Sequence, residues 1–233
     1  MRKLPVFFVI DVSESMAGPA HEAVSAGIAD IVSTLRTDPQ ALEMAQLSII
    51  VFAGRAKVLV PMMELLHFYP PDLPIGGGTG LGAALDLLMT EIDKNVVTKS
   101  SDGRKGDWKP IVFLMTDGHP TDDPEKSIKR WEEHYARRVN LVAVSVGGSA
   151  NHKMLQRLTE NVVVLTDASA TTFKRFLVWI SQSIAAESRA AGDGHAGGPV
   201  NLSKTLPRGA SVLDDLMPEV NIDDRLAGFI GRC

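Results

Sequence analysis

The sequence contains almost no cysteine, since Cys233 is the single one among 233 residues. No internal disulfide can form, and such a chain is typical of a reducing compartment. Long apolar runs are also missing. The run near the N-terminus, Leu4 to Ile10, stops at the carboxylate of Asp11. It is too short to cross a membrane, and no small-residue cleavage site of a secretory signal follows it. We therefore expect a soluble, cytoplasmic protein without a membrane partner.

Basic residues are not concentrated anywhere along the chain. The formal net charge is -4, and the densest cationic cluster is only Arg104, Lys105 and Lys109. A nucleic-acid-binding domain usually carries a basic stripe or patch, so we exclude nucleic acid as the main partner. The six histidines show no spacing typical of zinc ligands.

Apolar segments typical of buried strands alternate with segments of helical periodicity. Strands are expected at 4–10, 47–52, 57–60, 111–115, 141–146 and 162–165, and helices at about 20–35, 80–93, 125–137 and 173–184. The link 53–56 is too short for a crossover, so the strands that flank it should pair antiparallel. The pattern predicts an α/β fold: a doubly wound (Rossmann-like), mostly parallel sheet of about six strands, with one antiparallel edge strand and helices on both faces.

Composition divides the chain into three segments. The hydrophobic content of 45% is sufficient for one core, which we assign to a domain at 1–187. The segment 188–211 is rich in Gly, Ala and Ser and is expected to be a flexible linker. The segment 212–233 interleaves apolar and acidic residues, so we expect it to dock on its own domain or on a partner.

Oxygen-bearing side chains occur in three loops next to the predicted strands. Asp11, Ser13 and Ser15 follow the first strand, Thr79 lies among glycines, and Asp117 follows the strand 111–115. Ligands of doubly wound sheets bind at the carboxyl ends of the strands, so Asp11 and Asp117 should meet there if their strands are neighbours. Mg²⁺ prefers near-octahedral oxygen ligands, keeps several waters and usually takes one or two carboxylates. We therefore predict that these five residues bind Mg²⁺, with Mn²⁺ or Ca²⁺ as alternatives.

This set of residues resembles a known family. Asp11-x-Ser13-x-Ser15, Thr79 and Asp117, in that order, resemble the metal-ion-dependent adhesion site (MIDAS) of a von Willebrand factor A (VWA) domain, and the resemblance covers roughly residues 4–187. It implies that the serines and the threonine contact Mg²⁺ through their hydroxyls and the aspartates mostly through waters. A carboxylate of a partner protein would then complete the coordination shell.

Two longer segments are similar to a particular group within that family. Residues 70–74 leading into 76–79, and residues 108–110 leading into 116–122, resemble the TerY-type proteins of bacterial tellurium-resistance systems. The resemblance implies a cytoplasmic, metal-bearing scaffold of a stress response, associated with a protein phosphatase and a kinase. Nothing in the chain indicates tellurium chemistry, because a lone terminal thiol is a poor basis for binding an oxyanion.

Other functional classes remain as alternatives. In a Mg²⁺-dependent phosphohydrolase Asp11 would be the nucleophile, but such enzymes place an acid/base aspartate two residues later, where this chain has Ser13. A serine hydrolase using Ser13 or Ser15 with His119 would lack the Gly-x-Ser-x-Gly elbow. A third alternative is a structural α/β module that binds no metal. We predict a protein-interaction module that is not an enzyme, and neither its partner nor its oligomeric state follows from the sequence.

Residues beside the three loops could determine specificity. Glu14, Met16, His119 and Asp122 are candidates for a rim around the metal that selects an acidic partner. Phe68 and Tyr69 are expected to pack on the sheet edge, because aromatic side chains are mostly buried. The segment 104–108 precedes a central strand, so it should lie at the opposite end of the sheet from the metal, as a solvated loop.

Overall fold

The computed structural model describes residues 2–98, 105–146, 150–165, 170–192, 206 and 210–212. Its strands form one sheet in the order β3-β2-β1-β4-β5-β6-β7. Five strands run parallel: β1 (Leu4–Asp11), β2 (Ala45–Phe52), β4 (Ile111–Thr116), β5 (Asn140–Val146) and β6 (Val162–Leu165). The two edge strands, β3 (Ala56–Glu64) and β7 (Ala210–Val212), are antiparallel to their neighbours.

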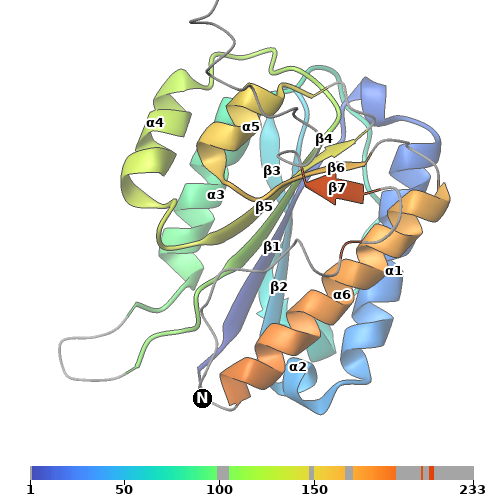
Figure 1. Cartoon of the computed structure of the whole chain (residues 1–233), viewed down its shortest axis with the longest axis vertical. Helices are drawn as coiled ribbons and strands as arrows, with labels where there is room; N and C mark the ends of the chain where they lie inside the picture. The colour runs from blue at the N-terminus through green and yellow to red at the C-terminus, as the bar shows by residue number, and fades with distance from the viewer. Residues whose placement is uncertain are drawn as a thin grey trace, which may run out of the picture.

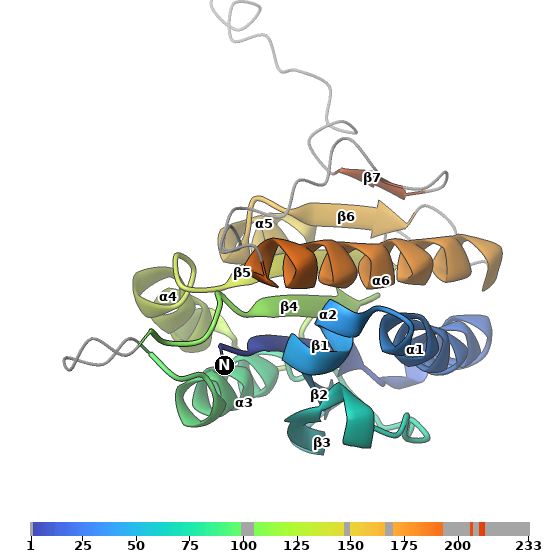
Figure 2. The same ribbon diagram turned by 90° about the horizontal axis from the view of Figure 1, so that it is seen from below.

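Helices cover both faces of this sheet (Figures 1 and 2). One face is covered by α1 (Pro19–Arg36), α2 (Pro39–Met44) and α6 (Ala170–Gly192), and the other by α3 (Leu81–Asn95), α4 (Glu125–His134) and α5 (His152–Leu158). Two short 3₁₀ helices, η1 (Glu14–Met16) and η2 (Leu65–His67), lie in the connections. The predicted doubly wound, mostly parallel fold is confirmed.

The sheet has one more strand than expected, and a second antiparallel edge. The additional strand β7 is only three residues long and lies far along the chain from its partner β6. Helices α2 and α5 were also not predicted. Both are shorter than the window in which helical periodicity can be recognised. Helix α2 begins with a strong local signal, because the side chain of Asp38 accepts hydrogen bonds from the amides of Gln40 and Ala41.

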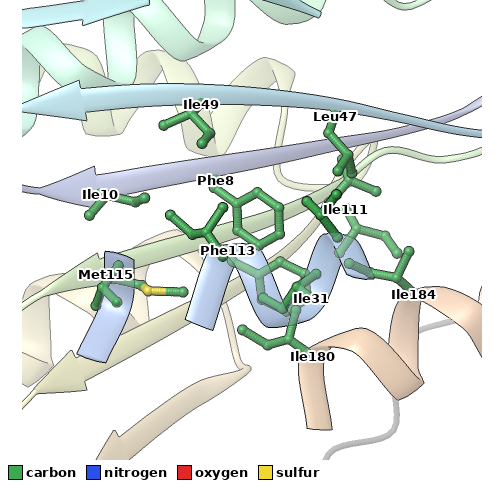
Figure 3. Packing of buried hydrophobic residues seen from close by; sticks show 14 of the residues in the cluster. Phe8, Ile10, Ile31, Leu47, Ile49, Ile111, Phe113, Met115, Ile180 and Ile184 are labelled. Atoms are coloured by element: carbon green, nitrogen blue, oxygen red, sulfur yellow. The ribbon is translucent and has the colours of Figure 1, made fainter. Parts of the chain in front are cut away.

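The core lies on both faces of the central strands. All eight residues of β1 are buried, as expected for a parallel strand covered by helices on either side. On the α1 and α6 face, the rings of Phe8 and Phe113 stack with their centroids 5.7 Å apart. Ile31 from α1 and Ile180 from α6 pack in the same cluster (Figure 3). This packing holds β1 and β4 side by side.

The predicted boundaries of the three segments, after residues 187 and 211, do not coincide with the ends of helices or strands in the described residues. Helix α6 continues to Gly192, beyond the expected domain end at 187, and β7 lies where the predicted linker meets the docking segment. Residues 193–205, 207–209 and 213–233, which include Cys233, lie outside the described residues. The flexible linker and the docking segment therefore stay predictions.

The aromatic pair after η2 divides between core and surface. Phe68 is fully buried, as predicted, whereas Tyr69 is 76% exposed and that prediction is wrong. The difference follows from the extended backbone at Phe68, in which successive side chains point to opposite sides. Arg36 stabilises this turn by donating to the carbonyl oxygens of Leu65, Leu66 and Phe68.

The described part of the segment 104–108 lies at the end of the sheet that was predicted for it. The amide of Trp108 donates to the carbonyl of Lys3, just before β1 begins. Trp108 is buried beneath the guanidinium of Arg2, which lies 3.5 Å from the ring centroid, so this part of the loop is not simply solvated. Among the described residues, no helix combines the length and the apolarity that crossing a membrane requires.

Candidate metal centre

The sheet topology brings the predicted site residues to one edge. Strands β1 and β4 are parallel neighbours, so Asp11 at the end of β1 and Asp117 just after β4 emerge on the same side. Ser13 and Ser15 follow in the loop that contains η1. The glycine loop joins them through a parallel bridge between Ser13 and Gly76, in which the Gly76 amide donates to the Val12 carbonyl at 2.8 Å.

The hydroxyls and carboxylates of this edge contact one another. The hydroxyl of Ser15 donates to Asp117 Oδ1 at 2.8 Å, and the Ser13 and Ser15 Oγ atoms are 3.0 Å apart. A Cβ built on Gly118 would lie 3.6 Å from Thr79 Oγ1 and 3.9 Å from Ser15 Oγ, so these two hydroxyls approach the same point. The structure thus brings together the side chains that the sequence analysis selected. Their role as metal ligands stays a prediction.

Asp11 lies deepest in the cluster, with 1% of its surface exposed. Its Oδ1 accepts from the Ser13 amide at 2.9 Å, and its Oδ2 accepts from Thr116 Oγ1 at 2.6 Å. Burial raises the pKa of the Asp11 carboxyl above its ordinary value of 3.8, although the hydrogen bonds from Ser13 and Thr116 act in the opposite direction. The nearby charge of Asp117 raises this pKa further. A cation at this edge would favour ionised Asp11.

The donor set fits a hard divalent cation. It consists of three hydroxyls and two carboxylates, which are oxygen ligands of the kind that Mg²⁺ prefers. No group of three or more His, Cys, Asp or Glu side chains suited to a metal occurs in the part of the chain that the structure describes. A metal held here would therefore depend on serine and threonine hydroxyls as well as on the aspartates.

The hairpin between β2 and β3 supports the glycine loop at close range. The amide of Gly54 donates to the Gly77 carbonyl at 2.6 Å, and the amide of Gly80 donates to the Ala53 carbonyl at 2.5 Å. A Cβ on Gly54 would lie 2.8 Å from the Gly77 oxygen, so only glycine permits this approach. These contacts determine where Thr79 lies.

Two supporting threonines were not identified from the sequence. Thr116 holds Asp11, and Thr121 holds Thr79: the Thr79 amide donates to Thr121 Oγ1 at 2.9 Å, and the Thr121 amide donates to the Thr79 carbonyl at 2.8 Å. Thr116 is the last residue of β4 and Thr121 lies in the loop that follows, so their closeness to Asp117 in the chain was the available signal. Neither could be assigned a partner without knowledge of the sheet order.

The predicted rim is only partly found at the surface. Glu14 and His119 are exposed, whereas Met16 is 1% exposed and belongs to the core, so its assignment to the rim is wrong. The carboxylate of Asp122 accepts a hydrogen bond from the Ala83 amide in the first turn of α3. Asp122 therefore connects the loop after β4 to the helix that follows the glycine loop.

Replacing Thr116 with valine should weaken metal binding without changing the shape of the core. The substitution removes the donor to Asp11 Oδ2 and leaves that buried oxygen without a partner. Loss of a group that orients a metal ligand typically reduces affinity by about 10–100-fold. Isothermal titration with Mg²⁺ or Mn²⁺ measures the effect. Thr116→Ser, which keeps the hydroxyl, is the control, and equal affinities for all three proteins would show that Asp11 needs no such support.

Comparisons with known proteins agree with this architecture. The family model of the von Willebrand factor type A domain matches residues 6–177. A von Willebrand factor type A structure from Catenulispora acidiphila is similar at a TM-score of 0.59 and 17% identity, over 79% of this chain and 43% of that one. The ArnB paralog VWA2 from Sulfolobus acidocaldarius is similar at a TM-score of 0.54 and 14% identity, over 80% of this chain and 45% of that one.

A third similar structure has an occupied metal site. Proximal thread matrix protein 1 from the mussel byssus, solved with a zinc-occupied MIDAS motif, gives a TM-score of 0.54 at 18% identity, over 79% of this chain and 48% of that one. This chain thus spans less than half the length of the three proteins. Likenesses at such identities show the fold alone.

Proposed function

Because this chain belongs to the von Willebrand factor type A domain family, we propose that it is a metal-dependent protein-interaction module which binds a carboxylate of a partner protein. The observation that carries the proposal is the contact of Ser13, Ser15 and Asp117 beside buried Asp11. The hydroxyls of Ser13, Ser15 and Thr79 would hold the metal, with the two aspartates in support. When bound, the metal supplies a positive charge and a coordination position for the partner.

The identity of the ligands supports carboxylate binding in particular. Hydroxyls are neutral, so a divalent metal held mainly by them keeps most of its charge and gains more from an additional anionic ligand. We propose Mg²⁺ as the metal, with Mn²⁺ or Ca²⁺ as alternatives. The zinc in the MIDAS motif of the mussel protein supports divalent metal binding by this fold in general.

The contacts of the site favour binding over catalysis. Both Asp11 oxygens accept hydrogen bonds and the residue is 1% exposed, which is unfavourable for a nucleophile of a phosphohydrolase. The hydroxyls of Ser13 and Ser15 contact each other and Asp117. Among the described residues neither hydroxyl is hydrogen-bonded to His119, the base that the serine-hydrolase alternative requires. We therefore propose that the protein is not an enzyme.

We also propose a cellular setting from the TerY-type resemblance. In that setting the protein is a cytoplasmic scaffold of a bacterial stress or tellurium-resistance system, and a phosphatase and a kinase are its partners. The support is the likeness of residues 70–74 and 76–79, and of residues 108–110 and 116–122, to those proteins. This assignment stays a prediction, and the binding experiment below would identify the partners directly.

A pull-down from native lysate tests the proposed function. Wild-type protein in Mg²⁺ should recover partners that are lost in EDTA and lost with an Asp11→Ala/Ser13→Ala variant, because both changes remove the metal. Asp86→Ala, which changes an exposed carboxylate on α3, is the control and should behave as wild type. Recovery of the same partners in every condition would mean that metal is incidental to binding.

The phosphohydrolase alternative predicts a different result with the same proteins. Purified wild-type protein would hydrolyse a phosphate ester in Mg²⁺, and Asp11→Ala would remove that activity. We expect no turnover above that of the Asp11→Ala variant. A metal-dependent rate that only the wild type shows would replace the scaffold proposal by an enzymatic one.

A further inference from the structure

A pocket of about 310 Å³ opens beside the candidate metal centre. Its wall includes Val12 and Gly76, the two residues whose backbones join the first loop to the glycine loop. Val12 lies between Asp11 and Ser13 in the chain, so the pocket begins one residue from two of the proposed metal-site residues. Consecutive Cα atoms are about 3.8 Å apart. A ligand that reaches the metal could therefore place a neighbouring residue in the pocket.

The inner wall of the pocket is apolar. Val51 and Ala53 at the end of β2 line it and are buried, and Ile75 lines it with 55% of its surface exposed. Ile75 is thus one of the few large apolar side chains that the described structure leaves in contact with solvent. Burial of apolar surface is the main favourable term in most protein association. The volume and the wall fit one large aliphatic or aromatic side chain of a partner.

The outer wall of the pocket is cationic. Arg55 and Lys57 line it, both are exposed, and neither side chain has an ion-pair partner among the described residues. Lys57 is paired in register with Val51, so the two side chains leave the sheet on the same face. No acidic residue occurs between positions 53 and 60.

In the strand order β3-β2-β1-β4 the loop after β4 and the hairpin lie on opposite sides of β1, and their charges are opposite. The loop after β4 carries Asp117, Asp122 and Asp123 and contains no lysine or arginine. A partner with two acidic groups, one of them on the metal, would be repelled from this loop and attracted to the hairpin. Such complementarity mainly determines orientation and specificity.

We propose that this pocket is a second subsite for the partner, which we call the hairpin subsite. The partner segment has a carboxylate for the metal, a large apolar residue one or two positions away for the wall formed by Val51, Ala53 and Ile75, and a further acidic residue facing Arg55 and Lys57. This inference rests on the proposed metal-dependent function, and it specifies the sequence that the site selects.

A peptide-display experiment tests this specificity. The probe is a library of peptides with one fixed aspartate and randomised flanks, selected on the protein in Mg²⁺ and eluted with EDTA. Enriched peptides should carry a large apolar residue next to the aspartate and additional acidic residues. One enriched peptide is then synthesised, and its affinity is measured by fluorescence anisotropy.

Variants separate the hairpin subsite from the metal. Arg55→Glu/Lys57→Glu should weaken the peptide at least tenfold and Ile75→Ser several-fold, while Mg²⁺ affinity remains unchanged. All three residues are exposed, so folding should tolerate these changes. Lys105→Glu/Arg137→Glu is the matched control, because it changes the net charge equally at exposed positions near the opposite end of the sheet.

The outcomes distinguish the two proposals. Mg²⁺-dependent peptides without an apolar or acidic preference, or with affinities that the Arg55 and Lys57 changes leave unaltered, would overturn the hairpin subsite and leave the metal-dependent function standing. If no enriched peptide required Mg²⁺, or if Ser13→Ala bound as tightly as wild type, both proposals would fail.

Discussion

Replacing Asp11 with asparagine should stabilise the metal-free protein and abolish its stabilisation by Mg²⁺. Burial raises the pKa of Asp11 in the folded state above the ordinary value of 3.8. The carboxyl therefore contributes stability that is fully present below about pH 4 and is lost as the pH rises through the folded-state pKa. Above that folded-state pKa the metal-free protein keeps an ionised group buried without a cation. Asparagine removes that charge and can still accept from the Ser13 amide.

Thermal unfolding with and without Mg²⁺ measures both effects. For a chain of this size, ~1 kcal/mol shifts the midpoint temperature by about 2–4 °C. A ligand at 100 times its dissociation constant stabilises by ~2.7 kcal/mol, so saturating Mg²⁺ should raise the wild-type midpoint by about 5–10 °C. Asp11→Asn should unfold a few degrees above metal-free wild type, whether or not Mg²⁺ is present.

The pH dependence provides the control for this experiment. As the pH rises from about 4 through the raised folded-state pKa of Asp11, metal-free wild type should lose stability that the Asp11→Asn variant retains. Asp86→Asn, at an exposed position, should follow the wild type in both respects. A variant that unfolds at lower temperature than metal-free wild type, yet still responds to Mg²⁺, would falsify the assignment of Asp11 to the metal site.

Replacing Phe8 with alanine should cost the largest share of stability of any single change considered for this protein. Its ring is fully buried, stacks on Phe113 and belongs to the cluster under α1 and α6 (Figure 3). Truncation of a buried phenylalanine to alanine costs ~3–5 kcal/mol, from lost apolar burial and from the cavity that remains. Since β1 ends at Asp11, the metal centre should also become less well ordered.

Urea unfolding monitored by circular dichroism measures this loss. We expect the midpoint concentration to fall by ~1–5 M, with little change in slope, because slopes for small domains are about 1–3 kcal/mol per M. Phe8→Leu keeps much of the volume and should cost less than ~1.5 kcal/mol. Similar losses for the two variants would mean that the ring stacking, rather than the cavity, determines the energetics.

The sequence could place Asp11, Ser13, Ser15 and Asp117 at one edge of the sheet because each follows a strand with a strong apolar signal. A buried parallel strand is a nearly continuous hydrophobic run, so the residue at which it ends can be recognised in the sequence. Polar residues just beyond that end can then be placed at the carboxyl edge of the sheet. This reasoning needs only local information, and the structure confirms that the four residues lie together.

Thr79 shows the limit of such reasoning. No strand leads into its loop, and its position depends on contacts between Gly54 and Gly77 and between Thr79 and Thr121, which are distant in the chain. The sequence analysis included Thr79 because it lies among glycines, whereas the long-range hydrogen bonds explain why it reaches the site. Thr116 was overlooked for a related reason: its acceptor, Asp11, becomes a neighbour only once β1 and β4 pair.

The sequence by itself determined the doubly wound fold, the ends of the central strands and the five candidate metal-site residues, because hydrophobic periodicity and loop chemistry are local properties. Only the tertiary structure decided the sheet order, the second antiparallel edge at β7 and the burial of Asp11. It alone also revealed the pocket lined by Val12, Arg55 and Gly76 beside the candidate metal centre. These features arise from pairing between segments far apart in the chain. Pairing of that kind depends on the packing of the whole domain, which no local pattern encodes.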